Sequence, residues 1–384
     1  MKRTLKKYTF KLLTPFFSVF IKKRKNFSLF GNGYGKFSDN SKYLFLYLLK
    51  NKQKNIFYVL DSKEEYQKLK HIYPVIYKNS ISTFFKVLRS EYFFFTHNIN
   101  DVFYGKRKST IAVNLFHGSG IKKMGFDSEV DLKWIVRMKK LGLKLPYDKW
   151  DFLSTAHENC NFIFKSSTHI CDEKIIATGL PRNDYLFDNK YNTEKINKLK
   201  INIFGEKNKK IILYAPTFRD YESGEIKDIL NNIMRLFKDM SISNNFIFGV
   251  RLHPKDVSLI DKRAFSTHVI NLTNYNVLEE LLLSADVLIT DYSSIFLDYS
   301  ILERPVLLYI HDFLKYQKVR GGFYFDFKND FKGYGISETL NELENNLLKA
   351  QTFTNPNFYK KYNTKNASSN ILNAIGFNLS KNNI

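Results

Sequence analysis

Two segments of the chain place a histidine directly after an apolar run, where it could move a proton or bind an anion. They are FHGSG (residues 116–120) and RLHP (residues 251–254). Histidine changes its charge near neutral pH, and an adjacent arginine such as Arg251 binds phosphate oxygens well. The plainer alternatives are a structural role for His117 and a polar surface turn around His253. These two segments are the first candidates for catalysis.

Two other segments of the sequence carry groups that suit a phosphate. In TDYSS (residues 290–294) the hydroxyls of Ser293 and Ser294 stand where a helix is predicted to begin, and the free amides of a helix N-terminus bind phosphate. Serine at this position is also a common helix cap. Arg320 precedes two glycines and could clamp a phosphate or lie on the surface. The pattern indicates phosphate chemistry in the second half of the chain.

Signatures of several other chemistries are missing from the sequence. There is no Gly-x-Gly-x-x-Gly after an apolar run, no P-loop and no Gly-x-Ser-x-Gly elbow. Asp-x-Asp and His-x-x-x-His pairs are also missing. We therefore expect no metal ion and no other cofactor.

The composition is that of a globular protein in a reducing compartment. Of 384 residues, 44% are hydrophobic and 25% are charged, and this length suits two domains. The only cysteines, Cys160 and Cys171, make neither a disulfide framework nor a zinc site. We expect a cytoplasmic protein.

The net charge of +23 favours anionic partners, such as phosphates, acidic polymers or an anionic membrane surface. Residues 1–25 hold nine Lys or Arg and no acid, and residues 355–384 hold four Lys and no acid. Basic residues beside bulky apolar ones suit a helix that lies in the headgroup region. The apolar run at residues 12–21 is far shorter than the ~20 residues of a spanning helix. We expect peripheral association with the inner face of the membrane; the alternative is that these apolar side chains dock on the protein's own core.

Short apolar runs alternate with helical patterns, which predicts an α/β protein with parallel sheets covered on both faces. A polar stretch at residues 188–210 separates two such halves, and we predict two Rossmann-like domains that face a cleft. The predicted strands are residues 56–60, 91–96, 110–116, 152–155, 174–178, 211–215, 246–252, 269–272, 286–290 and 305–310. The predicted parts are a basic amphipathic segment (residues 1–30), an N-terminal domain (residues 31–195) and a C-terminal domain (residues 205–384).

Seven segments resemble, in order and spacing, the motifs of the CDP-glycerol glycerophosphotransferases, which build teichoic acids and related capsular polymers. The segments are residues 31–50 (GNGYGKFSDNSKYLFLYLLK), 115–127 (LFHGSGIKKMGFD), 178–186 (TGLPRNDYL), 211–220 (IILYAPTFRD), 251–254 (RLHP), 286–298 (DVLITDYSSIFLD) and 315–326 (KYQKVRGGFYFD). The resemblance covers about residues 31–330 and implies a GT-B-type fold.

The resemblance implies transfer of glycerol phosphate from CDP-glycerol to a hydroxyl of a lipid-linked or polymeric acceptor, with release of CMP and no bound metal. His117 and His253 match the two family histidines implicated in catalysis. We expect His117 to be the base, because it lies in the half that would hold the acceptor; the opposite division is the alternative. The other expected site residues are Arg251, Thr290, Asp291, Ser293, Ser294, Arg320, Thr217 and Arg219 on the donor side, and Gly118, Ser119 and Asp127 on the acceptor side.

The chain departs from the family pattern in the motif around His117 and in the motif at residues 211–220. Phe116 and Phe218 stand where the family usually has Trp, and Ser119-Gly120 stands where it usually has Thr-Pro. The exact acceptor and polyol therefore stay open, and a transferase of the same fold that uses CDP-ribitol or a nucleotide sugar is the nearest alternative. A more distant one is a non-enzymatic basic protein that binds a membrane or nucleic acid. Since no nucleic-acid-binding signature is visible, we expect no nucleic-acid partner.

Overall fold

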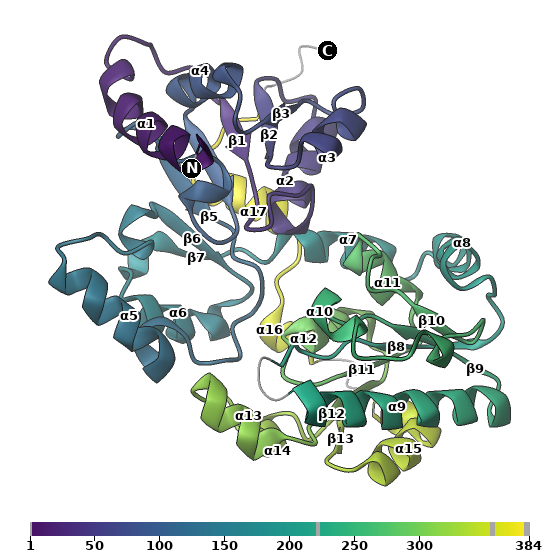
Figure 1. Ribbon diagram of the computed structural model, residues 1–384. Coiled ribbons are helices and arrows are strands. Elements are labelled where there is room, and N and C mark those ends of the chain that lie inside the picture. The colour runs from purple at the N-terminus through teal and green to yellow at the C-terminus, as the bar shows by residue number, and fades with distance from the viewer. Residues whose placement is uncertain (1, 220–222, 354–357, 380–384) are drawn as a thin grey trace. The chain divides into compact units, whose positions relative to one another are not determined.

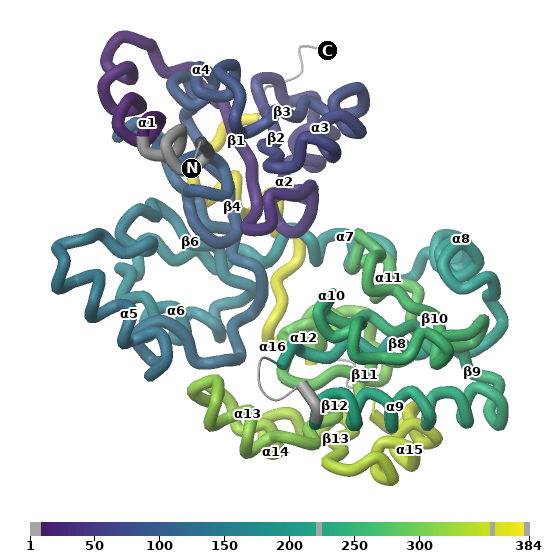
Figure 2. The backbone as a smooth tube through the Cα atoms, in the orientation of Figure 1, coloured from purple at the N-terminus to yellow at the C-terminus, as the bar shows by residue number. Residues whose placement is uncertain are grey.

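The structure is a computed structural model that describes residues 2–219, 223–353 and 358–379 (Figures 1 and 2). The chain forms two compact units, and each is described by itself. The first unit contains the described residues up to 119, residues 125–185 and the described residues from 364 onward. The second unit contains residues 120–124 and the described part of 186–363.

The two units differ from the predicted domains in their boundaries. The polar stretch at residues 188–210 is not a linker, because it contains α8 (Thr193–Phe204), which belongs to the second unit. The chain also returns to the first unit at its C-terminal end. There α17 (Ala367–Ala374) buries Ile371 and Leu372 in the core of the first unit. Residues from 364 onward were expected in the C-terminal domain, but apolar burial assigns them to the other unit.

The first unit is built on a seven-stranded parallel sheet with the order β3-β2-β1-β4-β5-β6-β7. Its central strand β1 was missed, because three residues are too few for a recognisable pattern. In β1 Phe30 pairs with Tyr58 on one side and Phe94 on the other, and the Phe30 and Phe94 rings stack at 4.8 Å. Residues 28–30 thus lie inside the sheet, between β2 and β4, and are not part of a separate N-terminal segment. The strands are β1 (Ser28–Phe30), β2 (Ile56–Leu60), β3 (Val75–Tyr77), β4 (Tyr92–Phe95), β5 (Ile111–Asn114), β6 (Phe152–Thr155) and β7 (Ile175–Ala177).

Helices cover this sheet, and α2 and α17 contribute Leu44, Leu48 and Ile371 to one core with Phe30 and Phe94. Apart from α17, the described helices of this part of the chain are α1 (Lys2–Phe17), α2 (Asp39–Lys50), α3 (Lys63–Leu69), α4 (Ile81–Arg89), α5 (Glu129–Lys140), α6 (Asn161–Thr168) and α7 (Pro181–Asn189), with the short helices η1 (Ile99–Asp101), η2 (Gly125–Asp127), η3 (Tyr147–Lys149), η4 (Glu158–Cys160) and η5 (Asp172–Lys174).

The helix α1 has two faces that differ in burial. One face docks on the first unit, where the Phe10 ring lies 5.2 Å from Phe84 and 5.3 Å from Phe103. On the other face Leu12 and Phe16 remain 76% and 61% exposed. The helix is therefore held by the protein and still presents apolar side chains to its surroundings.

The second unit is a six-stranded parallel sheet with the order β10-β9-β8-β11-β12-β13. Both units have parallel sheets covered by helices, so the α/β prediction is confirmed (Figure 1). The strands are β8 (Lys210–Tyr214), β9 (Phe246–Val250), β10 (Val269–Asn271), β11 (Val287–Thr290), β12 (Val306–Tyr309) and β13 (Gly335–Ser337). The helices are α8, α9 (Ser223–Ser243), α10 (Pro254–Val257), α11 (Leu278–Ser284), α12 (Ile295–Tyr299), α13 (Phe313–Arg320), α14 (Phe327–Asp330), α15 (Leu340–Leu348) and α16 (Tyr359–Tyr362), with η6 (Lys262–Ala264), η7 (Ser300–Leu302) and η8 (Ala350–Thr352).

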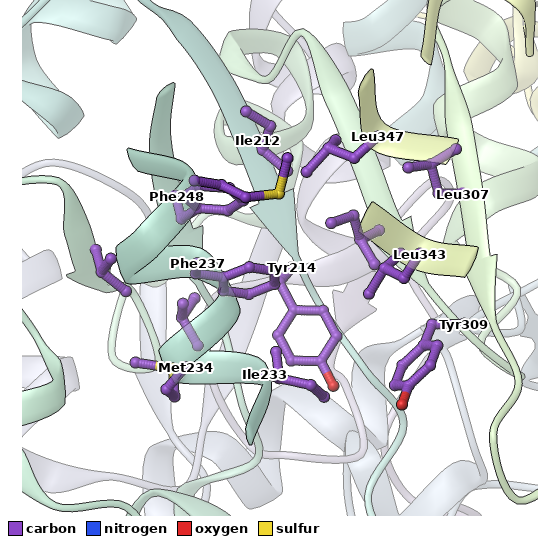
Figure 3. Packing of buried hydrophobic residues seen from close by; sticks show 14 of the residues in the cluster. Ile212, Tyr214, Ile233, Met234, Phe237, Phe248, Leu307, Tyr309, Leu343 and Leu347 are labelled. Carbon is purple, nitrogen blue, oxygen red and sulfur yellow. The ribbon is translucent and has the colours of Figure 1, made fainter. Parts of the chain in front are cut away.

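The core of the second unit lies between the sheet and the helices α9 and α15 (Figure 3). The Phe237 ring of α9 stacks on Phe248 of β9 at 4.3 Å and 12°, and Leu343 of α15 is fully buried beside Leu307 of β12. Each such side chain stabilises the fold by roughly 1.5–3 kcal/mol relative to exposure. This packing fixes the positions of the strand ends that carry the site.

Candidate active site

In the first unit, the loop that carries His117 leaves β5 in a strained conformation. Phe116 has a φ of +50°, a left-handed value that bulky residues rarely adopt. Two side-chain amides hold it: Asn114 Oδ1 accepts the Phe116 N–H at 2.8 Å, and Asn40 Nδ2 donates to the Phe116 carbonyl at 2.9 Å. Strain of this kind persists only where the surroundings enforce it. The bend therefore fixes the position of the next residue, His117.

The His117 ring is held by aromatic stacking and by one hydrogen bond. It stacks on His97 at 4.2 Å and 4°, and on Phe116 at 4.4 Å and 25°. Its Nδ1 lies 3.3 Å from the carbonyl oxygen of Thr96. Because a carbonyl oxygen only accepts hydrogen bonds, the neutral ring carries its proton on Nδ1 and its lone pair on Nε2. Nε2 is thus the atom that can take up a proton.

The surroundings of His117 favour the neutral ring. Burial by its neighbours lowers the pKa of His117 to about 4; the charge of His97 acts in the same direction and that of Asp39 opposes it. The residue as a whole is exposed at the surface, so solvent moderates this shift and only its direction matters here. At pH 7 the ring is neutral and can act as a base.

An arginine fixes the carbonyl side of the same loop. Arg182 Nη1 donates to the His117 carbonyl at 2.9 Å and to Asp39 Oδ1 at 2.9 Å. Two predicted acceptor-side residues, Gly118 and Ser119, are buried in this loop. The Ser119 hydroxyl has no hydrogen-bond partner among the described residues. Gly118 and Ser119 directly follow His117 in the chain.

The third predicted acceptor-side residue, Asp127, lies in η2. Its carboxylate accepts a hydrogen bond from the Ser166 hydroxyl of α6 at 2.5 Å. This contact ties η2 to α6, and a role of Asp127 toward an acceptor stays a prediction.

His97 is a site residue that the sequence reasoning missed. It follows β4 as His117 follows β5, so the rule that polar side chains after strands form sites would have selected it. Its Nδ1 lies 2.9 Å from the Thr96 hydroxyl. Gly33 leaves room for the ring, because a Cβ at that position would lie 2.2 Å from His97 Nδ1. The glycine-rich loop after β1 thus makes space for a pair of stacked histidines.

In the second unit, the buried Arg219 ties together loops that follow three strands. Its Nε and Nη2 donate to the two carboxylate oxygens of Asp312 at 3.0 Å each. Its Nη1 donates to Asp291 and, at 2.5 Å, to the carbonyl of Thr217. Burial disfavours the charged form, but the two carboxylates outweigh it and raise the pKa of Arg219 well above its usual range. The guanidinium is permanently charged and holds β8, β11 and β12 in register at their carboxyl ends.

Four predicted donor-side residues are occupied by contacts within the protein. Thr290 is fully buried and donates to the Ala215 carbonyl at 2.7 Å. Asp291 accepts from the Thr217 N–H at 2.8 Å and from its hydroxyl at 2.6 Å. Because Arg219 already donates to two carboxylates, few of its N–H groups remain for a phosphate. We assign Thr217, Arg219, Thr290 and Asp291 to positioning the loops.

The other four predicted donor-side residues are partly exposed, so an anion can reach them. Ser294 stands directly before α12, with Ser293 beside it, and Arg320 is the last residue of α13. Arg251 follows β9, where its backbone N–H donates to the Tyr214 carbonyl at 2.9 Å. These side chains lie at the same edge of the parallel sheet.

His253 is exposed at the start of α10 and carries the opposite tautomer to His117. Its Nδ1 accepts the backbone N–H of Lys255 at 3.3 Å, and its ring lies 4.3 Å from Phe218. Because Nδ1 accepts, the neutral ring carries its proton on Nε2. His253 therefore presents a hydrogen-bond donor where His117 presents an acceptor.

A small pocket in the second unit lies beside Arg219, and both polar and apolar side chains line it. Burial lowers the pKa of His311 in its lining. The lining residues are Tyr214, Pro216, Thr217, Arg219, Glu225, Ile226, Ile229, Leu230, Asp256, His311 and Asp312.

Two properties of the described residues bear on metal binding and on membrane spans. In that part of the chain no group of three or more His, Cys, Asp or Glu side chains is arranged to hold a metal ion. Among the same residues, no helix combines the length and the hydropathy needed to cross a bilayer.

The chain is similar to known proteins over nearly its whole length. Residues 13–376 match the family described as CDP-glycerol:poly(glycerophosphate) glycerophosphotransferase. The teichoic acid glycerol-phosphate transferase of Staphylococcus aureus is 29% identical over 384 residues, which cover 94% of this chain and 95% of that protein. The teichoic acid glycerol-phosphate primase of Bacillus subtilis is 31% identical over 327 residues, which cover 83% and 78%. The structure of the wall teichoic acid polymerase TagF matches with a TM-score of 0.76 at 23% identity, covering 92% of this chain and 88% of that one, which shows a GT-B-type fold.

Proposed function

Because this chain belongs to the CDP-glycerol:poly(glycerophosphate) glycerophosphotransferase family, we propose that it transfers glycerol phosphate from CDP-glycerol to a hydroxyl of a lipid-linked or polymeric acceptor in teichoic acid synthesis. In the step, the acceptor oxygen forms a bond to the phosphorus that bears glycerol. The bond from this phosphorus to the bridging oxygen breaks, and its electron pair leaves with CMP. The acceptor's proton passes to a base.

His117 is the base in this proposal, and its tautomer is the single observation that carries the assignment. The contact of Nδ1 with the Thr96 carbonyl directs the lone pair to Nε2, and the lowered pKa keeps the ring neutral. An alcohol is a weak nucleophile, so a positioned base contributes ~10²–10⁴-fold. The strained bend at Phe116 supports the role, because it holds the ring without movement.

His253 acts on the donor side as a hydrogen-bond donor through Nε2. Together with Arg251, Ser293 and Arg320, it stabilises the phosphoryl oxygens as charge develops on them. The partial exposure of these side chains supports the assignment.

The test is nucleotide release by the full chain with a lipid-linked glycerol phosphate acceptor. CDP-glycerol, CDP-ribitol and common nucleotide sugars are compared, and CDP-glycerol is expected to release CMP fastest. His117→Asn and His253→Asn are each expected to lower kcat/KM by about 10²-fold or more. His71→Asn, in an exposed loop, is the matched control and should be neutral. Faster release from another donor would reassign the substrate, and a near-normal His117→Asn would remove the proposed base.

We also propose that the first unit binds an anionic membrane surface, where a lipid-linked acceptor lies. Beside the exposed apolar face of α1, a hollow is lined by Phe20 and Ile21 and by four basic side chains. Cations next to exposed apolar groups suit acidic headgroups above acyl chains. The basic side chains of the hollow are Lys22, Lys23, Arg24 and Arg89.

The helix α5 adds exposed apolar and basic side chains to the proposed membrane-binding surface of the first unit. It exposes Trp134 and Val136 beside several lysines, and Leu141 and Leu143 follow it in the exposed state. A cluster of Lys11, Lys144 and Lys149 connects α1 with this region: burial lowers the pKa of Lys149, and the charges of Lys11 and Lys144 lower it further. These lysines are close enough to repel one another, so an anionic surface would stabilise them together.

Point variants test this association better than a deletion does. Deleting residues 1–25 would also remove the contact between the Phe10 and Phe84 rings. Leu12→Ser with Phe20→Ser is expected to lower binding to phosphatidylglycerol vesicles, with little binding of any variant to phosphatidylcholine. Ile242→Ser, an equally exposed apolar change in the second unit, is the control. Unchanged binding of the double variant would disprove the role of α1.

A further inference from the structure

Lys122 lies in a short segment that is fixed against the glycine pair following Arg320. The Lys123 N–H donates to the Gly322 carbonyl at 3.0 Å, and the Tyr324 N–H donates to the Ile121 carbonyl at 3.0 Å. Between them Lys122 and Phe323 form an antiparallel bridge. The backbone of Lys122 is thus held from both sides, so this is not a freely moving surface lysine.

The ammonium group of Lys122 lies against an aromatic face and pairs with no carboxylate among the residues that the structure describes. Its Nζ is 5.2 Å from the centre of the Tyr316 ring, which stacks on Tyr292 at 4.2 Å. Within the described part of the chain, no acid lies within 4.0 Å of it. The acids at these strand ends, Asp291 and Asp312, are already bonded to Arg219.

The charges around Lys122 favour the binding of an anion beside it. Burial lowers the pKa of Lys122 to about 8; Asp291 opposes this effect, and Arg320 and Arg219 add to it. Tyr316, the remaining titratable group against it, has a pKa raised by its own burial. A partly buried ammonium group beside two guanidinium groups is unfavourable unless a further negative charge binds there.

We propose that Lys122 binds the diphosphate of the CDP-activated donor and stabilises the negative charge on the departing CMP. The inference rests on the proposed function, because that donor supplies the anion which the cluster lacks. An ammonium group acts on phosphate as a compact point charge. In the transfer step the electron pair of the breaking P–O bond moves onto CMP, and a nearby cation stabilises that charge. Lys122 then neutralises the product without taking part in proton transfer.

The experiment compares three variants of the full chain: Lys122→Met, Lys122→Arg and Lys123→Met. Lys123 is the matched control, because it is the adjacent lysine and is exposed. Calorimetry measures the Kd of CDP and of cytidine, and the release of CMP from CDP-glycerol gives kcat and KM. Lys122→Met is expected to weaken CDP binding by about 10- to 100-fold, the usual effect of losing a charge-assisted hydrogen bond. Lys122→Arg should keep most of the affinity, and cytidine binding should not change.

The pH dependence separates a phosphate contact from a merely structural role. A bound anion favours the charged lysine and raises its pKa, so CDP binding should weaken as the pH rises above 8 in the unmodified protein. In Lys122→Arg this weakening should vanish, because the guanidinium stays charged. A structural role would leave both curves alike.

The outcomes distinguish this inference from the proposed function. If Lys122→Met binds CDP and releases CMP as Lys123→Met does, the role of Lys122 is overturned and the function stands. If the unmodified protein binds CDP through Lys122 but releases no CMP from CDP-glycerol, the function fails and the diphosphate contact stands. If the unmodified protein does not bind CDP, both are overturned.

Discussion

Replacing Arg219 with lysine tests whether this residue holds the fold of the site or contacts the donor. The guanidinium donates to both oxygens of Asp312, to Asp291 and to the Thr217 carbonyl. A lysine has one nitrogen and cannot make the two-pronged contact with Asp312 while it also reaches Asp291. At least one nearly inaccessible carboxylate then loses its cation, because the side chains of Asp312 and Asp291 are only 4% and 1% exposed.

The expected loss of stability in Arg219→Lys follows from the cost of breaking a buried ion pair. Removing one partner outright costs about 3–5 kcal/mol. Lysine keeps the positive charge and part of the hydrogen bonding, so we expect a loss of about 2–4 kcal/mol. The loss should be local to the second unit, since all the partners of Arg219 that are named here lie there.

Two measurements report the stability of each unit separately. The two tryptophans, Trp134 and Trp150, lie in the first unit, so their fluorescence during denaturation reports that unit. Hydrogen exchange in peptides covering β8 and β11 reports the second unit. Arg263→Lys is the matched control, because Arg263 is paired with Asp261 but 91% exposed. Faster exchange in β8 and β11, with unchanged tryptophan fluorescence, is the expected result.

One result would refute this reasoning. If Arg219→Lys exchanged as slowly as the unmodified protein but bound CDP more weakly, Arg219 would be a ligand contact. The prediction from the sequence would then hold against the positioning role that we assign here.

Three further predictions follow from the site and the core. Since the pKa of His117 is lowered below its ordinary value, kcat/KM should fall on acidification only below the usual pH range of a histidine, and His97→Phe, which removes a nearby positive charge, should shift this fall toward higher pH in a pH–rate profile. Gly33→Ala places a Cβ 2.2 Å from His97 Nδ1 and should lower kcat/KM by about tenfold through misplacement of the ring, with an unchanged denaturation midpoint. Leu343→Ala removes a fully buried side chain and should destabilise the second unit by about 2–5 kcal/mol in denaturant titrations; a loss below ~1 kcal/mol would contradict the packing described.

The sequence by itself determined the alternation of strands and helices and the polar clusters that follow the strands. Both are local signals, because an apolar run of five residues and the polar residues after it are visible without knowing their partners. His117 and His253 were found in this way, and His97 was missed only because the same rule was not applied to β4. The positions of these residues along the chain were therefore predictable.

Only the tertiary structure decided what each polar side chain contacts. The three-residue strand β1 is central because it pairs with β2 and β4, and α17 joins the first unit because its apolar face is buried there. Thr290 ends β11 and Arg219 follows β8, yet both are bonded to neighbouring loops, while Ser293, which follows β11, is accessible. The physical reason is that burial and hydrogen bonding depend on segments far apart in the sequence. Lys122 is the clearest example. The aromatic ring against its ammonium group belongs to Tyr316, and the positive charges that repel it belong to Arg219 and Arg320.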